Sequence, residues 1–143
     1  MSEASQKVPR EITRDILESF LKCKHKAHLQ LVAKKGIKSD FVNIQRESWP
    51  HFKQEATQKI LYKLTESEVL RNATVNNEIL NQGAEYVINS LATYDCFSLL
   101  FDGLKRVSTR SKGANFYYIP ILFVQTDKIH VYEKRLLAPI LFI

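Results

Sequence analysis

Two apolar runs on either side of a basic segment constrain the fold of this chain most strongly. The stretch from Phe97 to Gln125 reads FSLLFDGLKRVSTRSKGANFYYIPILFVQ. Strand-length apolar runs joined by turn residues are typical of a β-hairpin. We therefore expect strands over 96–107 and 114–125. Pro120 in the second run favours an edge position, a bulge or a bend, because proline cannot donate a backbone hydrogen bond to a neighbouring strand.

One carboxylate, Asp102, lies among the apolar side chains of the first run. A buried acid costs free energy unless it is paired, solvated or bound to a metal. Cations follow it directly, and no acid occurs over 103–126. Asp102 is therefore a candidate metal ligand beside a phosphate-binding surface. The alternative is a structural acid that caps the hairpin turn or pairs with Lys105 or Arg106.

The residues before the hairpin favour helices. Thr13 is a plausible N-cap for a first helix that ends near Gly36, with a possible break into two short helices near Cys23. Its buried stripe is predicted from apolar spacing: Ile16, Phe20, Cys23, Ala27 and Leu31. A second helix is expected to start at Pro50 and run to about residue 65, after an ambiguous stretch over 38–47.

The remaining segments complete an α+β pattern. We expect a connector from 66 to about 77, a helical turn over 77–82 ending at Gly83, a strand over 84–92, and a helix within 129–137. Helices first and an antiparallel meander afterwards predict N-terminal helices packed on a short, mostly antiparallel β-sheet.

Length and composition indicate one domain. The chain has 143 residues, of which 45% are hydrophobic, enough for a buried core. We expect a disordered tail over 1–9 and a single domain over 10–143. Because the sequence ends in the apolar run LLAPILFI, we also expect either a C-terminal truncation or a tail tucked into the sheet. Two distant cysteines, without a signal peptide or a membrane span, favour a cytoplasmic protein.

The net charge of +6 favours an anionic partner, with nucleic acid as the usual candidate. No acid occurs over 19–39, so this helix could neutralise phosphates, although a solvated helix face explains the same pattern. Zinc-finger, nucleotide-loop, serine-triad and HExxH patterns are missing. The candidate nucleic-acid-binding residues are Lys22, Lys24, Lys26, Lys34, Lys35, Lys105, Arg106, Arg110 and Lys112.

Two further sets of residues were considered as metal ligands. His51 and Glu55 lie four apart on a predicted helix, so both project from one face and could serve Asp102, or form a surface pair. Cys23 and Cys96 are better explained as small core residues than as ligands, since two cysteines cannot hold a four-cysteine cluster.

Two segments carry a resemblance to a known family. ITRDILESFLKCKHKAHLQL resembles the opening helix of RecB-like nucleases of the PD-(D/E)XK superfamily, including CRISPR-associated exonucleases. FDGLKRVSTRSKGANFYYIPILFVQTDKI resembles the core hairpin of RecB-family nucleases. The resemblance covers most of the chain, from Ile12 to about Ala138. It implies a PD-(D/E)XK, restriction-endonuclease-like core, here incomplete, in a nuclease that acts on DNA.

The resemblance also implies roles for individual residues. Asp102 matches the first metal-binding acid, while Glu55 and His51 match helper ligands from the preceding helix. The implied cofactor is Mg²⁺ or Mn²⁺ that activates water. No iron–sulfur cluster is expected, because the cysteines that hold it in some relatives have no counterpart beyond Cys23. Lys105, with its basic neighbours, would hold the phosphate backbone.

The sequence departs from the family at the second half of the metal site. Active members carry D/E-x-K on the next strand, where this chain has Tyr118-Ile119-Pro120-Ile121-Leu122-Phe123. We therefore expect a DNA-binding module that is catalytically impaired or incomplete. One alternative is an active Mg²⁺-dependent deoxyribonuclease that uses Asp102, Glu55 and a displaced Lys128. Another is an interaction or fragment protein that associates with a partner, or with itself, through the apolar end Pro139–Ile143.

Overall fold

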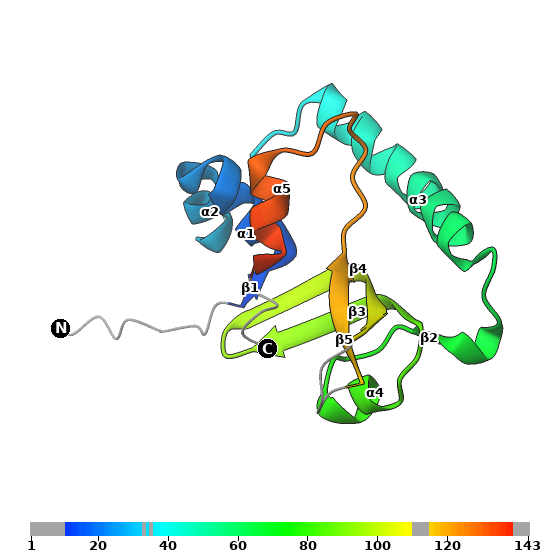
Figure 1. Ribbon diagram of the computed structural model, residues 1–143. Helices are drawn as coiled ribbons and strands as arrows, with labels where there is room; N and C mark the ends of the chain where they lie inside the picture. Colours follow the sequence, from blue (N-terminus) through cyan, green and yellow to red (C-terminus); the bar gives the residue numbers. More distant parts are fainter. Residues whose placement is uncertain (1–10, 33, 35, 110–114, 139–143) are drawn as a thin grey trace.

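The hairpin predicted from the two apolar runs is present in a mixed five-stranded sheet, in which its first strand is central and its second lies at an edge (Figure 1). The computed structural model describes residues 11–32, 34, 36–109 and 115–138. In it, β4 (Phe97–Ser108) pairs antiparallel with β5 (Phe116–Ile121). The second strand ends four residues earlier than expected, and the chain is α+β as predicted. The predicted tail over 1–9 and the apolar end over 139–143 lie outside the described residues.

Two short parallel strands extend the sheet. β3 (Tyr86–Tyr94) pairs antiparallel with β4, while β1 (Ile12–Thr13) is parallel to β4 and β2 (Val69–Arg71) is parallel to β3. The sheet order is β1-β4-β3-β2, with β5 also paired to β4. The two parallel strands were not predicted, because segments of two or three residues carry no measurable alternation. The longer pairings are antiparallel, as expected.

The first predicted helix is broken at Cys23, as the sequence suggested. α1 (Arg14–Lys22) and α2 (Lys24–Leu31) are separated by extended backbone at this residue. The predicted buried stripe is wrong in part, because Phe20 is 48% exposed and Cys23 is exposed. The buried residues of the two helices are Ser19, which precedes the break, and Ala27, which was predicted. The helix also ends at Leu31 and not near residue 36.

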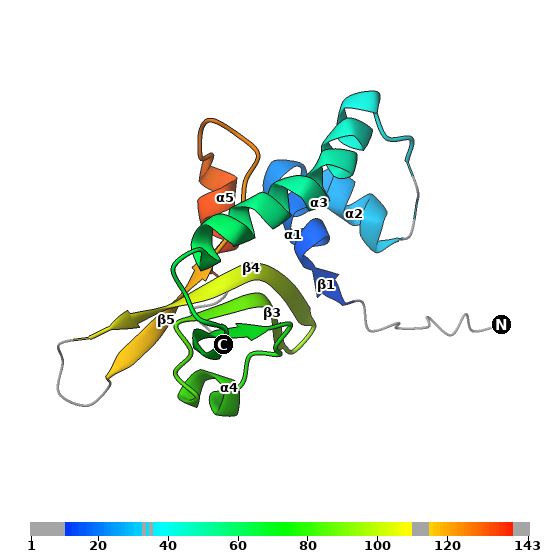
Figure 2. The ribbon, with the colours of Figure 1, turned by 90° about the vertical axis from the view of Figure 1, so that its right-hand side faces the viewer.

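The long helix α3 (Asp40–Leu61) begins ten residues before its predicted start. Ser39 caps it by accepting a hydrogen bond from the Val42 N–H, and the ambiguous stretch over 38–47 is largely helical. Pro50 lies inside the helix, not at its first turn. None of the residues of α3 is buried, and Figure 2 shows the helix lying across one side of the sheet.

The short elements near β3 fit the sequence better. α4 (Asn77–Asn81) is capped by Asn76 and followed by Gly83 with φ +72°, a left-handed conformation that favours glycine. A 3₁₀ turn, η1 (Glu66–Glu68), precedes β2, and α5 (Val131–Leu136) follows the sheet.

The Tyr118 phenol donates to the Ala84 carbonyl at 2.7 Å, and burial raises the pKa of this phenol. None of the helices in the described ranges is long and apolar enough to cross a membrane.

Pro120 lies on the outer edge of β5, as the edge prediction required. The Arg106 N–H donates to the Glu85 carbonyl on the β3 side of β4. The backbone N–H and C=O groups of neighbouring strand residues point to alternate sides of the strand. The backbone groups of Lys105 therefore point to β5, and those of its partner Ile119 point back to β4. Pro120, the next residue, therefore faces away from β4, where its missing N–H removes one donor from the free edge. β5 pairs with β4 alone among the described strands.

The core of the sheet requires glycine at one position. Val87, Leu99 and Leu104 are almost fully buried, and Gly103, next to Leu104 on β4, is also buried. A Cβ at this residue would stand 2.9 Å from the Val87 carbonyl oxygen. We expect Gly103→Ala to destabilise the fold by about 1–3 kcal/mol, because backbone in a packed sheet must shift. Urea unfolding measures the loss; an unchanged midpoint would contradict the close approach.

Replacing the internal proline of α3 is expected to stabilise the protein. Pro50 is exposed, lacks the N–H that would complete the helical ladder, and disfavours a helix interior. Pro50→Ala should raise the free energy of unfolding by up to about 3 kcal/mol. Far-ultraviolet circular dichroism combined with thermal unfolding measures both helix content and stability. Gln54→Ala, at an exposed position of the same helix and without a ring to remove, serves as the control and should change the stability by less than about 0.5 kcal/mol.

Candidate functional site

The buried carboxylate of Asp102 is the centre of the site. The residue is 1% exposed and belongs to β4. Its Oδ2 accepts a hydrogen bond from the Phe123 N–H at 2.8 Å and one from Arg14 Nη1 at 3.1 Å. Its Oδ1 lies 3.3 Å from Lys53 Nζ. The alternative in which Asp102 caps the hairpin turn or pairs with Lys105 or Arg106 is therefore wrong; its partners come from two helices.

Arg14 reaches Asp102 from the first residue of α1. Its Nε also donates to Glu18 Oε1 at 2.8 Å, one helical turn further along. Burial lowers the pKa of this guanidinium, but the charges and hydrogen bonds of Asp102 and Glu18 outweigh it, so the pKa is raised. Arg14 also donates to the Leu100 carbonyl at 3.3 Å. These contacts fix the start of α1 against β4.

Lys53 takes the place that the sequence analysis gave to Glu55. A helical residue two positions further on lies roughly 200° around the axis, so Glu55 cannot face the carboxylate that Lys53 contacts. The Glu55 side chain is 57% exposed and lies 4.0 Å from His51 Nδ1. Glu55 lines a separate shallow pocket near the end of α3. The structure therefore does not bring His51 or Glu55 to Asp102; they form the surface pair that was the alternative.

Asp102 opens into a cleft of about 660 Å³. The cleft is walled by α1, α3, the middle of β4, the segment 122–126 and α5. Two more cations line it, Lys22 from α1 and Arg46 from α3, together with the single tryptophan, Trp49. Lys22 Nζ lies 4.4 Å from the centre of the Tyr132 ring, a cation–π distance. The cleft is thus lined by four basic residues and three aromatic ones, Trp49, Phe123 and Tyr132.

Acids line the same cleft, and most of them are engaged. Glu18 is bound by Arg14, and Asp102 is bound by both Arg14 and Lys53. Glu133 is 7% exposed, and its carboxylate accepts the His130 N–H at 2.6 Å at the start of α5. Lys22 and Arg46, in contrast, have no acidic partner within the described residues. These two cations are therefore available to an anionic ligand.

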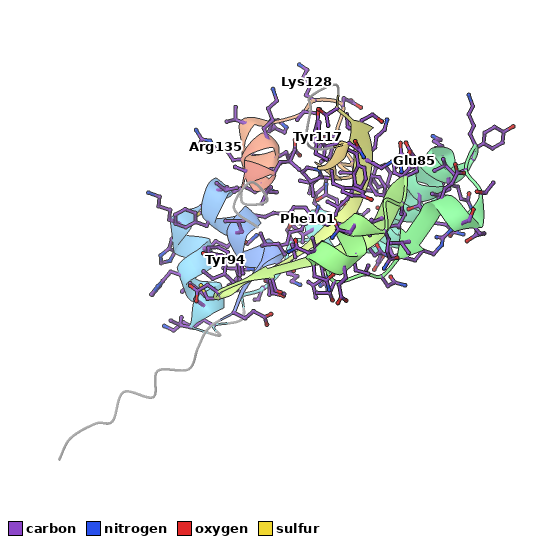
Figure 3. The ribbon with its side chains drawn as sticks, turned by 60° about the horizontal axis from the view of Figure 1, so that its bottom comes forward. Glu85, Tyr94, Phe101, Tyr117, Lys128 and Arg135 are labelled. Carbon is purple, nitrogen blue, oxygen red and sulfur yellow. The ribbon has the colours of Figure 1, made fainter. Side chains whose placement is uncertain are left out.

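The other predicted site residues lie outside the cleft. Figure 3 shows Lys128 at the outer end of the loop before α5, away from Phe101, which precedes Asp102. Lys105 is exposed on β4, and Arg106 is bound to Glu85 at 2.8 Å and to the Gly83 carbonyl. The exposed lysines of α2 and the following segment are Lys24, Lys26 and Lys34. Lys35, Arg110 and Lys112 lie outside the described residues.

The structure gathers no metal site of the usual kind. No group of three His, Cys, Asp or Glu side chains that could hold a metal ion occurs in the described ranges. Cys23 is exposed and Cys96 is half-buried, so Cys23 is not the core residue that was predicted. Within the cleft, the nearest charged atoms around Asp102 are cationic, and a second carboxylate is not among its recorded partners.

Arg14, Arg46, Trp49 and Lys53 were missed by the sequence analysis. Arg14 lies inside the segment ITRDILES, but it was given no role there. Arg46 fell in the ambiguous stretch over 38–47, and Trp49 fell just before the predicted helix start at Pro50. A helix predicted over 40–61 would have placed Arg46 and Trp49 on one face with Lys53, since the three residues are spaced three and four apart. The missed signal was therefore the helix start at Ser39.

The chain resembles nothing in the comparisons with known proteins. No protein-family model, no curated protein and no solved structure matches it.

A double-mutant cycle tests the Asp102–Lys53 contact. Asp102→Asn keeps an acceptor for the Phe123 N–H but leaves the half-buried Lys53 without its charge partner and Arg14 paired with Glu18 alone. We expect a loss of about 2–3 kcal/mol, below the range for a fully buried pair because both cations retain some exposure. Combined with Lys53→Met, the two changes should show a coupling energy of about 1–2 kcal/mol.

Glu55→Gln supplies the matched control on the same helix. Because Glu55 faces away from Asp102, its change should be additive with Asp102→Asn within about 0.5 kcal/mol. Denaturant unfolding of the six proteins measures both cycles. Coupling of Asp102 to Glu55 but not to Lys53 would reverse the assignment of the helix face.

Proposed function

We propose that this chain is a DNA-binding module on a RecB-like, PD-(D/E)XK nuclease core that holds DNA in its cleft without cleaving it. The observation that carries the proposal is a cleft in which Lys22 and Arg46 have no acidic partner among the described residues, while its buried acid, Asp102, is paired with Arg14 and Lys53. The two unpaired cations supply affinity for phosphate, and the neutralised Asp102 explains why hydrolysis is not expected.

Phosphate binding follows from the unpaired cations. Lys22 and Arg46 line the cleft from α1 and α3. Each cation that neutralises a phosphate releases condensed counterions, which gives affinity that falls with salt. Exposed lysines on α2, which carry no acid among them, continue the positive surface beyond the cleft. A phosphodiester backbone could therefore be followed from α2 into the cleft.

Loss of catalysis follows from the charges around Asp102. A Mg²⁺ ion prefers oxygen ligands and is normally held by more than one carboxylate or by a carboxylate and substrate phosphates. Arg14 and Lys53 contribute two positive charges and Glu18 and Asp102 two negative ones, so this cluster is formally neutral. An ion at Asp102 would have to displace the Lys53 ammonium. The chain therefore lacks the excess negative charge that holds a catalytic metal.

The nuclease core itself is supported by the order of elements and by the position of Asp102. A helix, an antiparallel meander and a further helix surround an acid on the central strand. The family carries D/E-x-K on the strand after the hairpin turn. Here Leu122 and Val124 line the cleft beside Asp102, and neither can bind a metal or orient water. This agrees with a core that keeps its first acid and has lost the rest.

Salt-dependent binding tests the proposal. We expect the wild type to bind labelled DNA with a log–log salt dependence that Arg46→Ala and Lys22→Ala each reduce by about one unit of slope. Binding should also change the fluorescence of Trp49, the single tryptophan. Addition of Mg²⁺ or Mn²⁺ should produce no cleavage of single- or double-stranded DNA.

Controls separate the cleft from general surface charge. Lys59→Ala removes an exposed cation from α3 outside the cleft and should alter the salt slope less than Arg46→Ala does. Cleavage that requires a metal and disappears in Asp102→Asn would establish the active nuclease instead. Absence of DNA binding at low salt would remove the proposed function altogether.

A further inference from the structure

A second exposed surface lies on the β4–β5 hairpin, outside the cleft. Residues directly opposite in an antiparallel ladder share one face, and so do residues two apart on a strand. The register places Tyr86, Lys105 and Ile119 side by side across three strands. Tyr117, two residues before Ile119, lies on the same face. We call these four residues the hairpin face.

The hairpin face is open to solvent to a degree that is unusual for such side chains. Tyr117 is 53% exposed, Ile119 is 40% exposed and Lys105 is exposed. Figure 2 shows the end of the hairpin extending beyond the helices, so none of the drawn helices covers it there. Exposed aromatic and apolar side chains gathered on one surface mark an interaction site more often than isolated ones do.

Charge indicates what kind of partner fits. Lys105 Nζ lies 5.8 Å from the centre of the Tyr86 ring and has no acidic partner within the described residues. Among the described residues no acid occupies this face, since the adjoining positions are Ile88, Gly103, Val107 and Ile121. A second copy packed face to face would bring two Lys105 ammonium groups into one apolar interface, which disfavours self-association. Aromatic rings beside a cation suit an anionic strand with flat bases.

We propose that the hairpin face stacks unpaired bases of the bound nucleic acid, with Tyr117 as the main platform and Lys105 beside the phosphate. Stacking on tyrosine needs an unpaired base, whose π-face is free, and tolerates any sequence. This inference rests on the DNA binding proposed above. It adds a contact to the bases, whereas the cations of the cleft contact only phosphates. It also predicts a preference for single-stranded segments at this surface.

An abasic strand separates the two contacts. The probes are a labelled oligothymidylate of about 16 nucleotides, the upper site size of single-strand binding folds, and an abasic strand of equal length and charge. We expect the wild type to bind the base-bearing strand about tenfold more tightly. Tyr117→Val, which keeps a strand-forming apolar residue, should remove most of that preference. Tyr117→Phe retains the ring and should keep it.

Two further variants make the failures distinguishable. Tyr94→Ala removes a tyrosine that is 59% exposed at the other end of β3 and should leave the preference intact. Arg46→Ala should lower the salt slope for both strands and keep the preference. Equal affinity of the wild type for both strands, or an unchanged preference in Tyr117→Val, would contradict base stacking on the hairpin face. Neither result would contradict DNA binding in the cleft. Failure of the wild type to bind either strand removes both proposals.

Discussion

The fold around the cleft depends on one buried carboxylate. Asp102 accepts hydrogen bonds from the Phe123 N–H and from Arg14 and forms an ion pair with Lys53, so one side chain joins the segment after β5, the first helix and the long helix to the central strand. This matters most for α3, which buries none of its residues. Two polar contacts join α3 to the rest of the cleft: the Lys53–Asp102 ion pair and the hydrogen bond between Gln125 and Ser48 at 3.3 Å.

The same cluster decides what the cleft can bind. The charge of the buried Asp102 carboxylate is balanced by two cations, Arg14 and Lys53, without a metal. In this fold the acid joins structural elements to one another. The cations that remain without acidic partners in the described part of the chain, Lys22 and Arg46, lie at the walls and not around Asp102. An anion is therefore expected along the cleft, between its walls, and not at its floor.

The sequence predicted those parts of the fold that have a strong local signal. The hairpin, the break at Cys23 and the turn at Gly83 follow from apolar alternation and from turn residues, and all three are confirmed. The strands β1 and β2 could not be predicted, because their two or three residues pair only when the longer strands are in place. The start of α3 was missed because Pro50 was treated as a helix start, although an exposed proline can be tolerated inside a helix at a cost.

The central residue of the candidate site, Asp102, was predicted, but its charged partners were missed because they lie far from it in the sequence. Asp102 was identified because an acid in an apolar strand is anomalous within a single segment. Its partners are Arg14 and Lys53, which are ordinary surface-type residues in their own helices. Nothing local distinguishes Lys53 from Glu55, two residues away, until the helix start fixes the phase of α3. Long-range pairing of charges is a property of the assembled fold, so periodicity alone cannot reveal it.

The charge balance of the cleft also bears on where affinity can come from. Four acids and four basic side chains line it, so its formal charge is zero although the chain carries +6. Two unpaired cations provide only a small number of phosphate contacts, and affinity from that source falls steeply with salt. A DNA strand that is bound at moderate salt needs a contribution to its binding free energy that salt does not screen. Base stacking is such a contribution, and the exposed rings on the hairpin face are the surface that could supply it.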